Sequence, residues 1–169
     1  MKFILKFISY LSILLMSTNM EAQVQSKSFN FVLKTLLSHD VPEILVPAAA
    51  KATAQSIFLD TREPEEFAVS HLPNARFAGY KHFDEKQLSD LPKNAPIIVY
   101  CAVGKRSENI TERLLKSGFT NVKNLYGGIF EWVNQGHPVY DANNKPVNKV
   151  HGYSRLWGRF IERGEKVYD

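Results

Sequence analysis

The chain has 169 residues, of which 44% are hydrophobic and 22% are charged, and this balance predicts one globular domain with additional segments at its ends. The formal net charge is only +4 and no basic stripe with interleaved aromatic residues occurs, so we do not expect nucleic-acid binding. The single cysteine excludes an intramolecular disulfide, and the five histidines are too scattered for a structural zinc site, so we expect no metal and no other cofactor.

Residues 1–22 have the features of an export signal. Lys2 and Lys6 supply positive charge ahead of an apolar run, Ile8–Met16, and Ala22 is the small residue after which cleavage is expected. The alternative is an uncleaved membrane anchor, but the apolar run is shorter than the about 20 residues that span a bilayer. We therefore predict an exported protein, periplasmic in a bacterium, with no stable membrane insertion after signal removal. An uncleaved signal would leave it anchored to the membrane.

Residues 23–52 are predicted to form a helix followed by an edge segment. Apolar residues between Phe29 and Leu37 recur on one helical face, which indicates a short amphipathic helix. Ile44–Val46 has the composition of a short strand, and Pro47 suits the first turn of a small helix that reaches Ala54.

Strand and helix patterns alternate after residue 53. The apolar run Ser56–Leu59 predicts a strand with Asp60 at its carboxyl end, and Arg62 can pair with Asp60 or with Glu66. A helix start, a short strand and a further helix are expected next, at residues 64–67, 76–80 and 84–91.

The stretch from Pro96 to Gly118 contains the candidate nucleophile. Ile97–Tyr100 predicts a buried strand, and apolar residues at helical spacing predict a helix that ends near Gly118. Cys101 starts the loop between them, so its thiolate would be stabilised by loop N–H groups and by the positive end of the helix dipole. The same loop could hold a second anionic atom bonded to the sulfur. The candidate site consists of Cys101 as the nucleophile and of the residues around it, Ala102, Val103, Gly104, Lys105, Arg106 and Ser107.

The remaining elements complete an α/β domain. A strand at 121–125 leads through Gly127 and Gly128 into a helix that places Trp132 in the core. Because strands and helices alternate, we predict a mainly parallel sheet with helices on both faces.

Residues 141–169 are predicted to form a C-terminal extension. A loop-like stretch precedes a helix that Ser154 could cap and Gly164 could end. The apolar residues of this helix would dock it on the domain. The alternative is a helix that binds a protein partner, because exposed apolar patches are uncommon on monomers.

Three stretches, in matching order and spacing, resemble the signatures of the rhodanese-like domain family of the single-domain thiosulfate sulfurtransferase type. They are the loop Cys101-Ala-Val-Gly-Lys-Arg-Ser107, the upstream runs Asp60-Thr-Arg62, Glu66-Phe67 and His71-Leu-Pro-Asn-Ala75, and the downstream Gly127-Gly128, Trp132 and Gly136-His-Pro-Val139. The chain departs from the pattern at Ser70 and Asn74, where glycine is usual, although asparagine tolerates a positive φ. The resemblance covers residues 53–140 and implies a three-layer rhodanese-like fold with a mainly parallel five-stranded sheet.

The resemblance also implies an activity. An exported sulfurtransferase of this kind would take a sulfane sulfur from a donor such as thiosulfate onto Cys101 as a persulfide and pass it to a thiol or cyanide. Asp60 and Arg62 would brace the site. Lys105 and Arg106 would attract the anionic donor, or else be solvent-exposed charges of the first helical turn. The expected partners are a small sulfur donor and a thiol acceptor.

Two other functions remain open. A non-catalytic rhodanese module that binds or regulates a partner would not need the cysteine, which this chain retains. An enzyme of the cysteine-phosphatase or arsenate-reductase kind would need room for a whole oxyanion. Four residues separate Cys101 from Arg106, one fewer than in the phosphatase signature, and Tyr100 stands where that signature has histidine.

Overall fold

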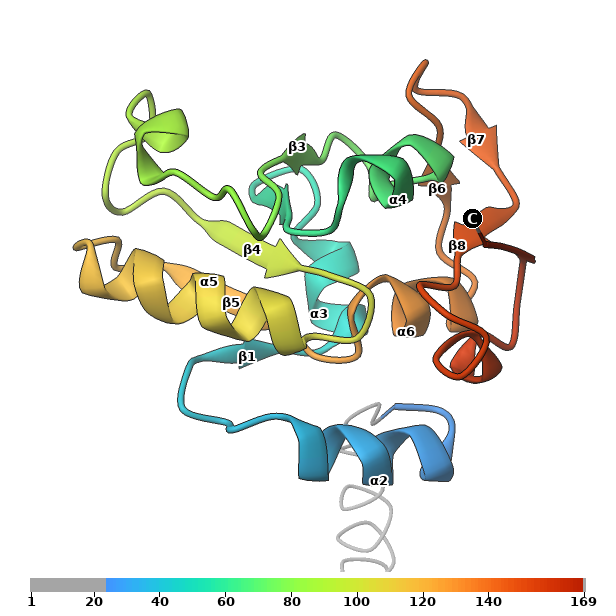
Figure 1. Cartoon of the computed structure of the whole chain (residues 1–169). Coiled ribbons are helices and arrows are strands. Elements are labelled where there is room, and N and C mark those ends of the chain that lie inside the picture. The colour runs from blue at the N-terminus through green and yellow to red at the C-terminus, as the bar shows by residue number, and fades with distance from the viewer. Residues whose placement is uncertain (1–23, 169) are drawn as a thin grey trace, which may run out of the picture.

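Strands and helices alternate along most of the part that the computed structural model describes, residues 24–168 (Figure 1). In chain order the elements are α2 (Lys27–Leu36), β1 (Glu43–Ile44), α3 (Val46–Lys51), β2 (Ile57–Asp60), α4 (Pro64–Val69), β3 (Arg76–Phe77), the 3₁₀ helix η1 (Glu85–Leu88), β4 (Ile97–Tyr100), α5 (Lys105–Lys116), β5 (Val122–Leu125), α6 (Gly128–Asn134), β6 (Val139–Tyr140), β7 (Pro146–Val147), β8 (Lys149–His151), the 3₁₀ helix η2 (Gly158–Phe160) and β9 (Glu165–Val167). The predicted export signal, residues 1–22, lies outside the described residues. Between residues 24 and 168, no helix combines the length and the apolar character that a membrane crossing requires.

A five-stranded parallel sheet forms the centre of the fold. Its strand order is β1-β5-β4-β2-β3, and every pair of neighbours runs parallel, as the alternation of strands and helices predicts. β4 therefore lies between β5 and β2. The residue that follows β4 emerges at the middle of the carboxyl edge, where open α/β sheets bind ligands.

The side chains of β4 alternate between two cores, which gives the molecule three layers. Ile98 and Tyr100 pack into the larger core with residues of α2, α3 and α6, whereas Ile97 and Val99 pack into the smaller core with residues of α5 and η1. All four side chains are buried, so β4 has apolar residues on both faces, as its sequence predicts. Trp132 of α6 is buried in the larger core, also as predicted. The predicted α/β fold with helices on both faces of the sheet is thus confirmed.

The beginning of α6 lies directly against the loop after β4. Ile129 N–H donates to the Cys101 carbonyl oxygen at 2.9 Å, and Phe130 N–H donates to that of Ala102 at 3.1 Å. A Cβ atom at Gly128 would lie 2.4 Å from the Cys101 carbonyl oxygen, and Gly128 has a φ of 56°. The approach therefore requires glycine at this position.

One of the two elements predicted between β2 and β4 is shorter than expected. Residues 76–80 are predicted to form a short strand and its exit, and the strand ends at Phe77, because the N–H groups of Ala78 and Gly79 both turn to the Asp60 carbonyl oxygen and Gly79 has a φ of 72°. The helix predicted at 84–91 is only the 3₁₀ turn η1. The Asp84 side chain accepts the N–H of Lys86, which favours a tight turn at this point.

The helix predicted after Ser154 is wrong. That segment contains the single turn η2, and it lies among the short strands β6 to β9, which the sequence analysis did not anticipate. The backbone at Gly152 and Gly158 packs against the Tyr168 ring, and a Cβ atom at Gly158 would lie 2.1 Å from the Tyr168 hydroxyl oxygen. The apolar residues are nevertheless docked on the domain: Phe160 stacks on Phe29 of α2 with ring centroids 5.0 Å apart.

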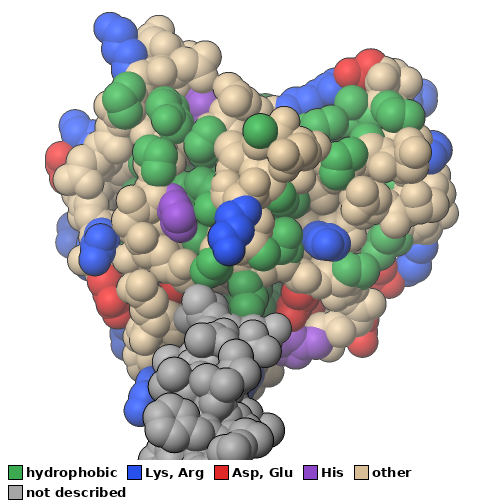
Figure 2. All heavy atoms as spheres, turned by 180° about the vertical axis from the view of Figure 1, so that it is seen from behind, with side chains coloured by type: hydrophobic (Ala, Val, Ile, Leu, Met, Phe, Trp, Pro, Cys, Tyr) green, Lys and Arg blue, Asp and Glu red, His purple; other side chains and the backbone are tan. Residues whose placement is uncertain are grey.

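Surface charge is dispersed on the face opposite to that of Figure 1. Figure 2 shows Lys and Arg side chains interspersed among hydrophobic and other side chains on this face. Several cations of the described chain also have carboxylate partners, among them Arg76, whose Nη1 lies 2.9 Å from Asp90 Oδ2. Such exposed pairs contribute little to stability.

We expect Gly128→Ala to lower the free energy of unfolding by about 3 kcal/mol or more. A positive φ costs an L-residue about 1–2 kcal/mol, and the added methyl group must also displace the Cys101 carbonyl. Gly118→Ala is the matched control, because Gly118 has a φ of 88° but nothing within 4 Å of an added Cβ atom. Urea unfolding of both variants measures the difference. Equal losses of unfolding free energy would contradict the conclusion that the approach of α6 to the Cys101 carbonyl requires glycine at position 128.

Candidate active site

Cys101 follows β4 directly and lies at the beginning of α5. Its sulfur accepts a hydrogen bond from Gly104 N–H at 3.2 Å. Gly104 is the N-cap of α5 and has a φ of 112°, a conformation that side-chain-bearing residues rarely adopt. The first N–H groups of a helix have no intrahelical acceptor and carry its positive partial charge, so the sulfur lies where an anion is stabilised.

Ser107 and Asn124 hold this loop from its buried side. The Ser107 hydroxyl donates to Asn124 Oδ1 at 2.7 Å, and Asn124 Nδ2 donates to the Gly104 carbonyl oxygen at 3.0 Å. Both residues are fully buried. Ser107 belongs to the predicted site, whereas Asn124 lies on β5 and nothing in the local sequence pointed to its role.

Arg106 forms a two-pronged ion pair with Glu66 of α4. Its Nη1 and Nη2 lie 2.7 and 2.8 Å from the two Glu66 carboxylate oxygens, and Glu66 Oε2 also accepts Glu63 N–H at 3.0 Å. Burial disfavours the ionised carboxylate, but the hydrogen bonds and charge of Arg106 outweigh it and lower the pKa of Glu66. Burial likewise opposes the charge of Arg106, while Glu66 and the Cys101 sulfur raise the pKa of Arg106 above its ordinary value.

Lys105 is paired in the same manner. Its Nζ lies 2.7 Å from Glu108 Oε2 and donates to the Ser38 hydroxyl at 3.1 Å. Glu108 Oε1 also accepts the N–H groups of Ser38 and His39, which connect α2 to β1. Burial opposes the ionised form of Glu108, but these bonds and the Lys105 charge lower the pKa of Glu108. Both cations of the loop therefore have a carboxylate partner.

Asp60 and Arg62 form a buried pair beside Tyr100 rather than beside the sulfur. Arg62 Nη2 lies 2.7 Å from Asp60 Oδ2 and donates to the Ser70 carbonyl oxygen at 2.6 Å. Asp60 is the register partner of Tyr100, and the Arg62 guanidinium lies 5.7 Å from the Tyr100 ring centroid. Burial, together with the Asp60 charge, raises the pKa of Tyr100 well above its ordinary value. Within residues 24–168, neither Asp60 nor Arg62 has a hydrogen bond or an ion pair with Cys101, so their place in the fold is to support the strand end that carries it.

A cavity of about 190 Å³ opens onto Cys101. Four other residues of its wall are predicted site residues: Ala102, Val103, Lys105 and Arg106. The rest of the wall is Leu36 of α2 and two aromatic residues of the C-terminal extension, Tyr153 and Trp157. These three residues are not among the predicted site residues, because nothing in their local sequence indicates which distant segment they contact.

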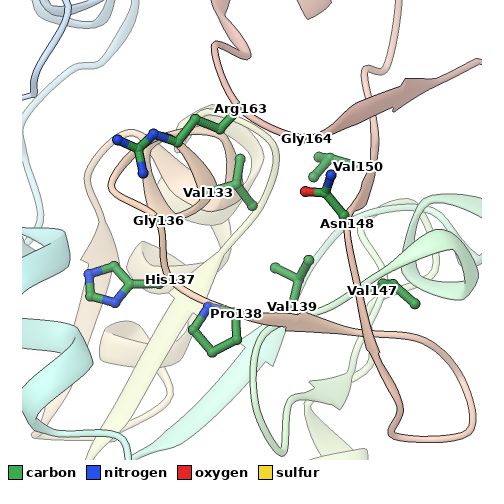
Figure 3. A pocket seen from close by; sticks show the side chains of 10 residues that line it. All are labelled: Val133, Gly136, His137, Pro138, Val139, Val147, Asn148, Val150, Arg163 and Gly164. Carbon is green, nitrogen blue, oxygen red and sulfur yellow. The ribbon is translucent and has the colours of Figure 1, made fainter.

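A second cavity, of about 280 Å³, lies between the end of α6 and the C-terminal extension (Figure 3). Valine side chains lie in its middle, with His137 and Arg163 to one side. Burial lowers the pKa of His137, which favours the neutral imidazole. No cysteine lines this cavity, and in the described part of the chain no group of three or more His, Cys, Asp or Glu could hold a metal ion. The cavity at Cys101 is therefore the candidate active site.

The family model of the rhodanese-like domain matches residues 46–135, which is more than half of the chain. This range contains β2 to α6 and all the predicted site residues. Leu36, Tyr153 and Trp157 lie outside it.

Several relatives show the same likeness. A sulfurtransferase from Allochromatium vinosum is 32% identical over 87 residues, which cover 52% of this chain and 80% of that protein. The thiosulfate sulfurtransferase GlpE from Coxiella burnetii is 31% identical over 90 residues, with 52% of this chain and 79% of that protein covered. The adenylyltransferase and sulfurtransferase UBA4 from Meyerozyma guilliermondii is 32% identical over 115 residues. These residues cover 62% of this chain but only 27% of that longer protein.

Solved structures agree on the fold. The crystal structure of a rhodanese-related protein from Thermoplasma volcanium has a TM-score of 0.54 at 28% identity, covering 58% of this chain and 96% of that chain.

We expect Glu66→Gln to lower the free energy of unfolding at pH 7 by about 3 kcal/mol, because it leaves the Arg106 charge without its partner in a mostly buried place. The pKa of Glu66 in the folded protein lies below its ordinary value of 4.5, so the carboxylate stabilises the fold above that pH and loses this effect as the pH falls through the lower folded value. The deficit of the variant should therefore shrink below about pH 4.5.

The control is Glu112→Gln, which removes an exposed pair with Lys116 and should cost less than about 1 kcal/mol. Urea unfolding from pH 7 to acid pH measures both variants. If the loss of unfolding free energy in Glu66→Gln did not change with pH, the ion pair between Glu66 and Arg106 would be contradicted as its cause.

Proposed function

This chain belongs to the rhodanese-like domain family, and on that premise we propose that it is a sulfurtransferase that carries a sulfane sulfur as a persulfide on Cys101. The observation that carries the proposal is the position of Cys101 after the central strand β4, with its sulfur at the N-terminus of α5 and bonded to Gly104 N–H. Relatives named sulfurtransferase and thiosulfate sulfurtransferase support the reaction type.

In the loading step, the Cys101 thiolate attacks the outer sulfur of a donor such as thiosulfate. The bond between Cys101 Sγ and that sulfur forms, the sulfur–sulfur bond of the donor breaks, and sulfite leaves with the bonding electron pair. The Gly104 N–H and the first N–H groups of α5 would stabilise the negative charge on the terminal persulfide sulfur. The residues that we assign to this cradle are Ala102 to Ser107.

In the unloading step, a thiolate or cyanide attacks the outer sulfur of the persulfide. The bond from this sulfur to Cys101 Sγ breaks, and its electron pair returns to the Cys101 thiolate. Arg106 lines the cavity together with Cys101 and is anchored by Glu66, so we assign it to stabilising the sulfur anion. Asp60 and Arg62 would act only through the position of β4.

The other two functions that the sequence left open have less support. A module that only binds a partner does not require the N–H cradle around Cys101. A phosphatase or arsenate reductase needs space for a tetrahedral oxyanion, and only four residues separate Cys101 from Arg106. A protein with either of these functions would not be expected to form a persulfide on Cys101.

We expect the protein, reduced and then treated with thiosulfate, to gain the mass of one sulfur atom. Cys101→Ser should show no gain, because its hydroxyl is a far weaker nucleophile than a thiolate. Cyanide should remove the added mass and release thiocyanate. Intact-mass spectrometry measures the gain and the loss.

The control variant is Lys116→Ala, since it keeps Cys101 and removes an exposed cation of α5 that is paired with Glu112. It should load within about tenfold of the native rate. If the reduced native protein gained no sulfur from thiosulfate or from an organic persulfide, sulfur transfer would be refuted and the binding-module function favoured.

We also propose that the protein is exported, to the periplasm if the source is a bacterium, after removal of residues 1–22. The chain expressed in a bacterium should be recovered from the periplasm with the mass of a protein whose first residue is Gln23. Ala22→Trp should keep its leader and remain with the membrane fraction, because cleavage needs a small residue there. A periplasmic chain that retains residues 1–22 would contradict the assigned cleavage.

A further inference from the structure

The segments outside the family match supply much of the wall around Cys101. Leu36 comes from α2, and Tyr153 and Trp157 come from the C-terminal extension, which lies beside α6 in Figure 1. Cys101 is only 1% exposed, so a reagent reaches the sulfur through this cavity. The three side chains therefore face a reagent on its way to the sulfur.

The wall is apolar, and its cations are compensated. Lys105 and Arg106, the charged residues of the wall, hold Glu108 and Glu66 at 2.7 Å. An inorganic anion gains little from cations that already have buried carboxylate partners. An apolar group gains by leaving water for contact with aromatic and aliphatic side chains.

Leu36, Tyr153 and Trp157 form the rim of the cavity, and contacts of the C-terminal extension with α2 and α6 hold this rim in place. Phe160 stacks on Phe29 of α2, and the Trp157 ring lies 6.0 Å from that of Phe160. The extension is also tied to α6, because Asn134 Nδ2 donates to the Phe160 carbonyl oxygen at 2.8 Å and Asn134 Oδ1 accepts Glu162 N–H at 2.7 Å. Trp157 thus belongs to a rigid part of the molecule.

Tyr153 lies at the rim although its side chain gains little from burial there. It is 54% exposed and has a φ of 60°, which bulky residues rarely adopt. Its N–H donates to His151 Nδ1 at 3.1 Å, and its ring lies 5.1 Å from the Arg106 guanidinium. The backbone therefore holds an exposed aromatic ring over the residue beside Cys101.

We propose that Leu36, Tyr153 and Trp157 form an apolar subsite that selects an organic thiol with a hydrophobic group of about one ring as the sulfur acceptor. The inference rests on the sulfurtransferase function proposed above. The size agrees, because a cavity of about 150 Å³ in another protein holds benzene, and this one has about 190 Å³.

The acceptor reacts with its hydrophobic group in the subsite. Its thiolate sulfur attacks the outer sulfur of the Cys101 persulfide and forms a new sulfur–sulfur bond. The bond to Cys101 Sγ breaks, and the electron pair returns to the Cys101 thiolate. The product is the persulfide of the organic thiol, and no external oxidant or reductant is consumed.

The test compares acceptors on the preloaded Cys101 persulfide of the full chain. Benzyl mercaptan carries a ring, 2-mercaptoethanol is a polar thiol without one, and cyanide cannot use the subsite. Rapid-quench mass spectrometry gives the second-order rate constant for loss of the sulfur to each acceptor. We expect a preference of about tenfold or more for benzyl mercaptan over 2-mercaptoethanol, comparable to the discrimination that a small apolar pocket provides.

Trp157→Ala and Tyr153→Ala should each reduce this preference several-fold, and Trp157→Ala should change the cyanide rate by less than about twofold. Trp157→Phe should retain most of it, and Tyr153→Ala, at an exposed position, keeps the test decisive if Trp157→Ala does not fold. The control is Leu156→Ala, since Leu156 is 59% exposed and does not line the cavity. It should leave all rates unchanged.

The outcomes separate the two proposals. If the persulfide forms and cyanide discharges it, but the native protein shows no preference or both aromatic variants keep it, the subsite is refuted and the sulfurtransferase function stands. If no persulfide forms with any donor, both proposals are refuted.

Discussion

Hydrogen bonds from the first turn of α6 to the carbonyl oxygens of Cys101 and Ala102 set the path of the loop on which the site depends. In a trans peptide the N–H points opposite to the carbonyl oxygen, so the N–H groups of Ala102 and Val103 point away from α6. The loop can hold this course only while the α6 backbone lies against it. Glycine at position 128 permits that approach, because any Cβ atom there would overlap the Cys101 carbonyl.

Two buried carboxylates connect the same loop to distant elements. Glu66 links Arg106 to the beginning of α4, and Glu108 links Lys105 to the chain between α2 and β1. These pairs compensate the two cations in part, and the Gly104 N–H and the α5 dipole add positive potential at Cys101.

The two sides of the cavity have different origins. Residues within the family match supply the sulfur and its N–H cradle, whereas α2 and the C-terminal extension supply the apolar rim. Stacking of Phe160 on Phe29 and the hydrogen bonds of Asn134 hold the rim against the domain. On the two proposals above, reaction type and acceptor choice would depend on different segments of the chain.

The sequence by itself determined β4, the Cys101 loop and α5, because apolar runs, a glycine at the turn and helical spacing act over a few neighbouring residues. It could not determine that Glu66 pairs with Arg106, since 40 positions separate them and only packing of α4 against the loop brings them together. Apolar spacing after Ser154 predicted a helix, but the segment contains only the turn η2, and its backbone at Gly152 and Gly158 packs against the Tyr168 ring from the end of the chain. The tertiary structure alone placed Tyr153 and Trp157 in the wall of the Cys101 cavity, because contacts between distant segments depend on how whole elements pack.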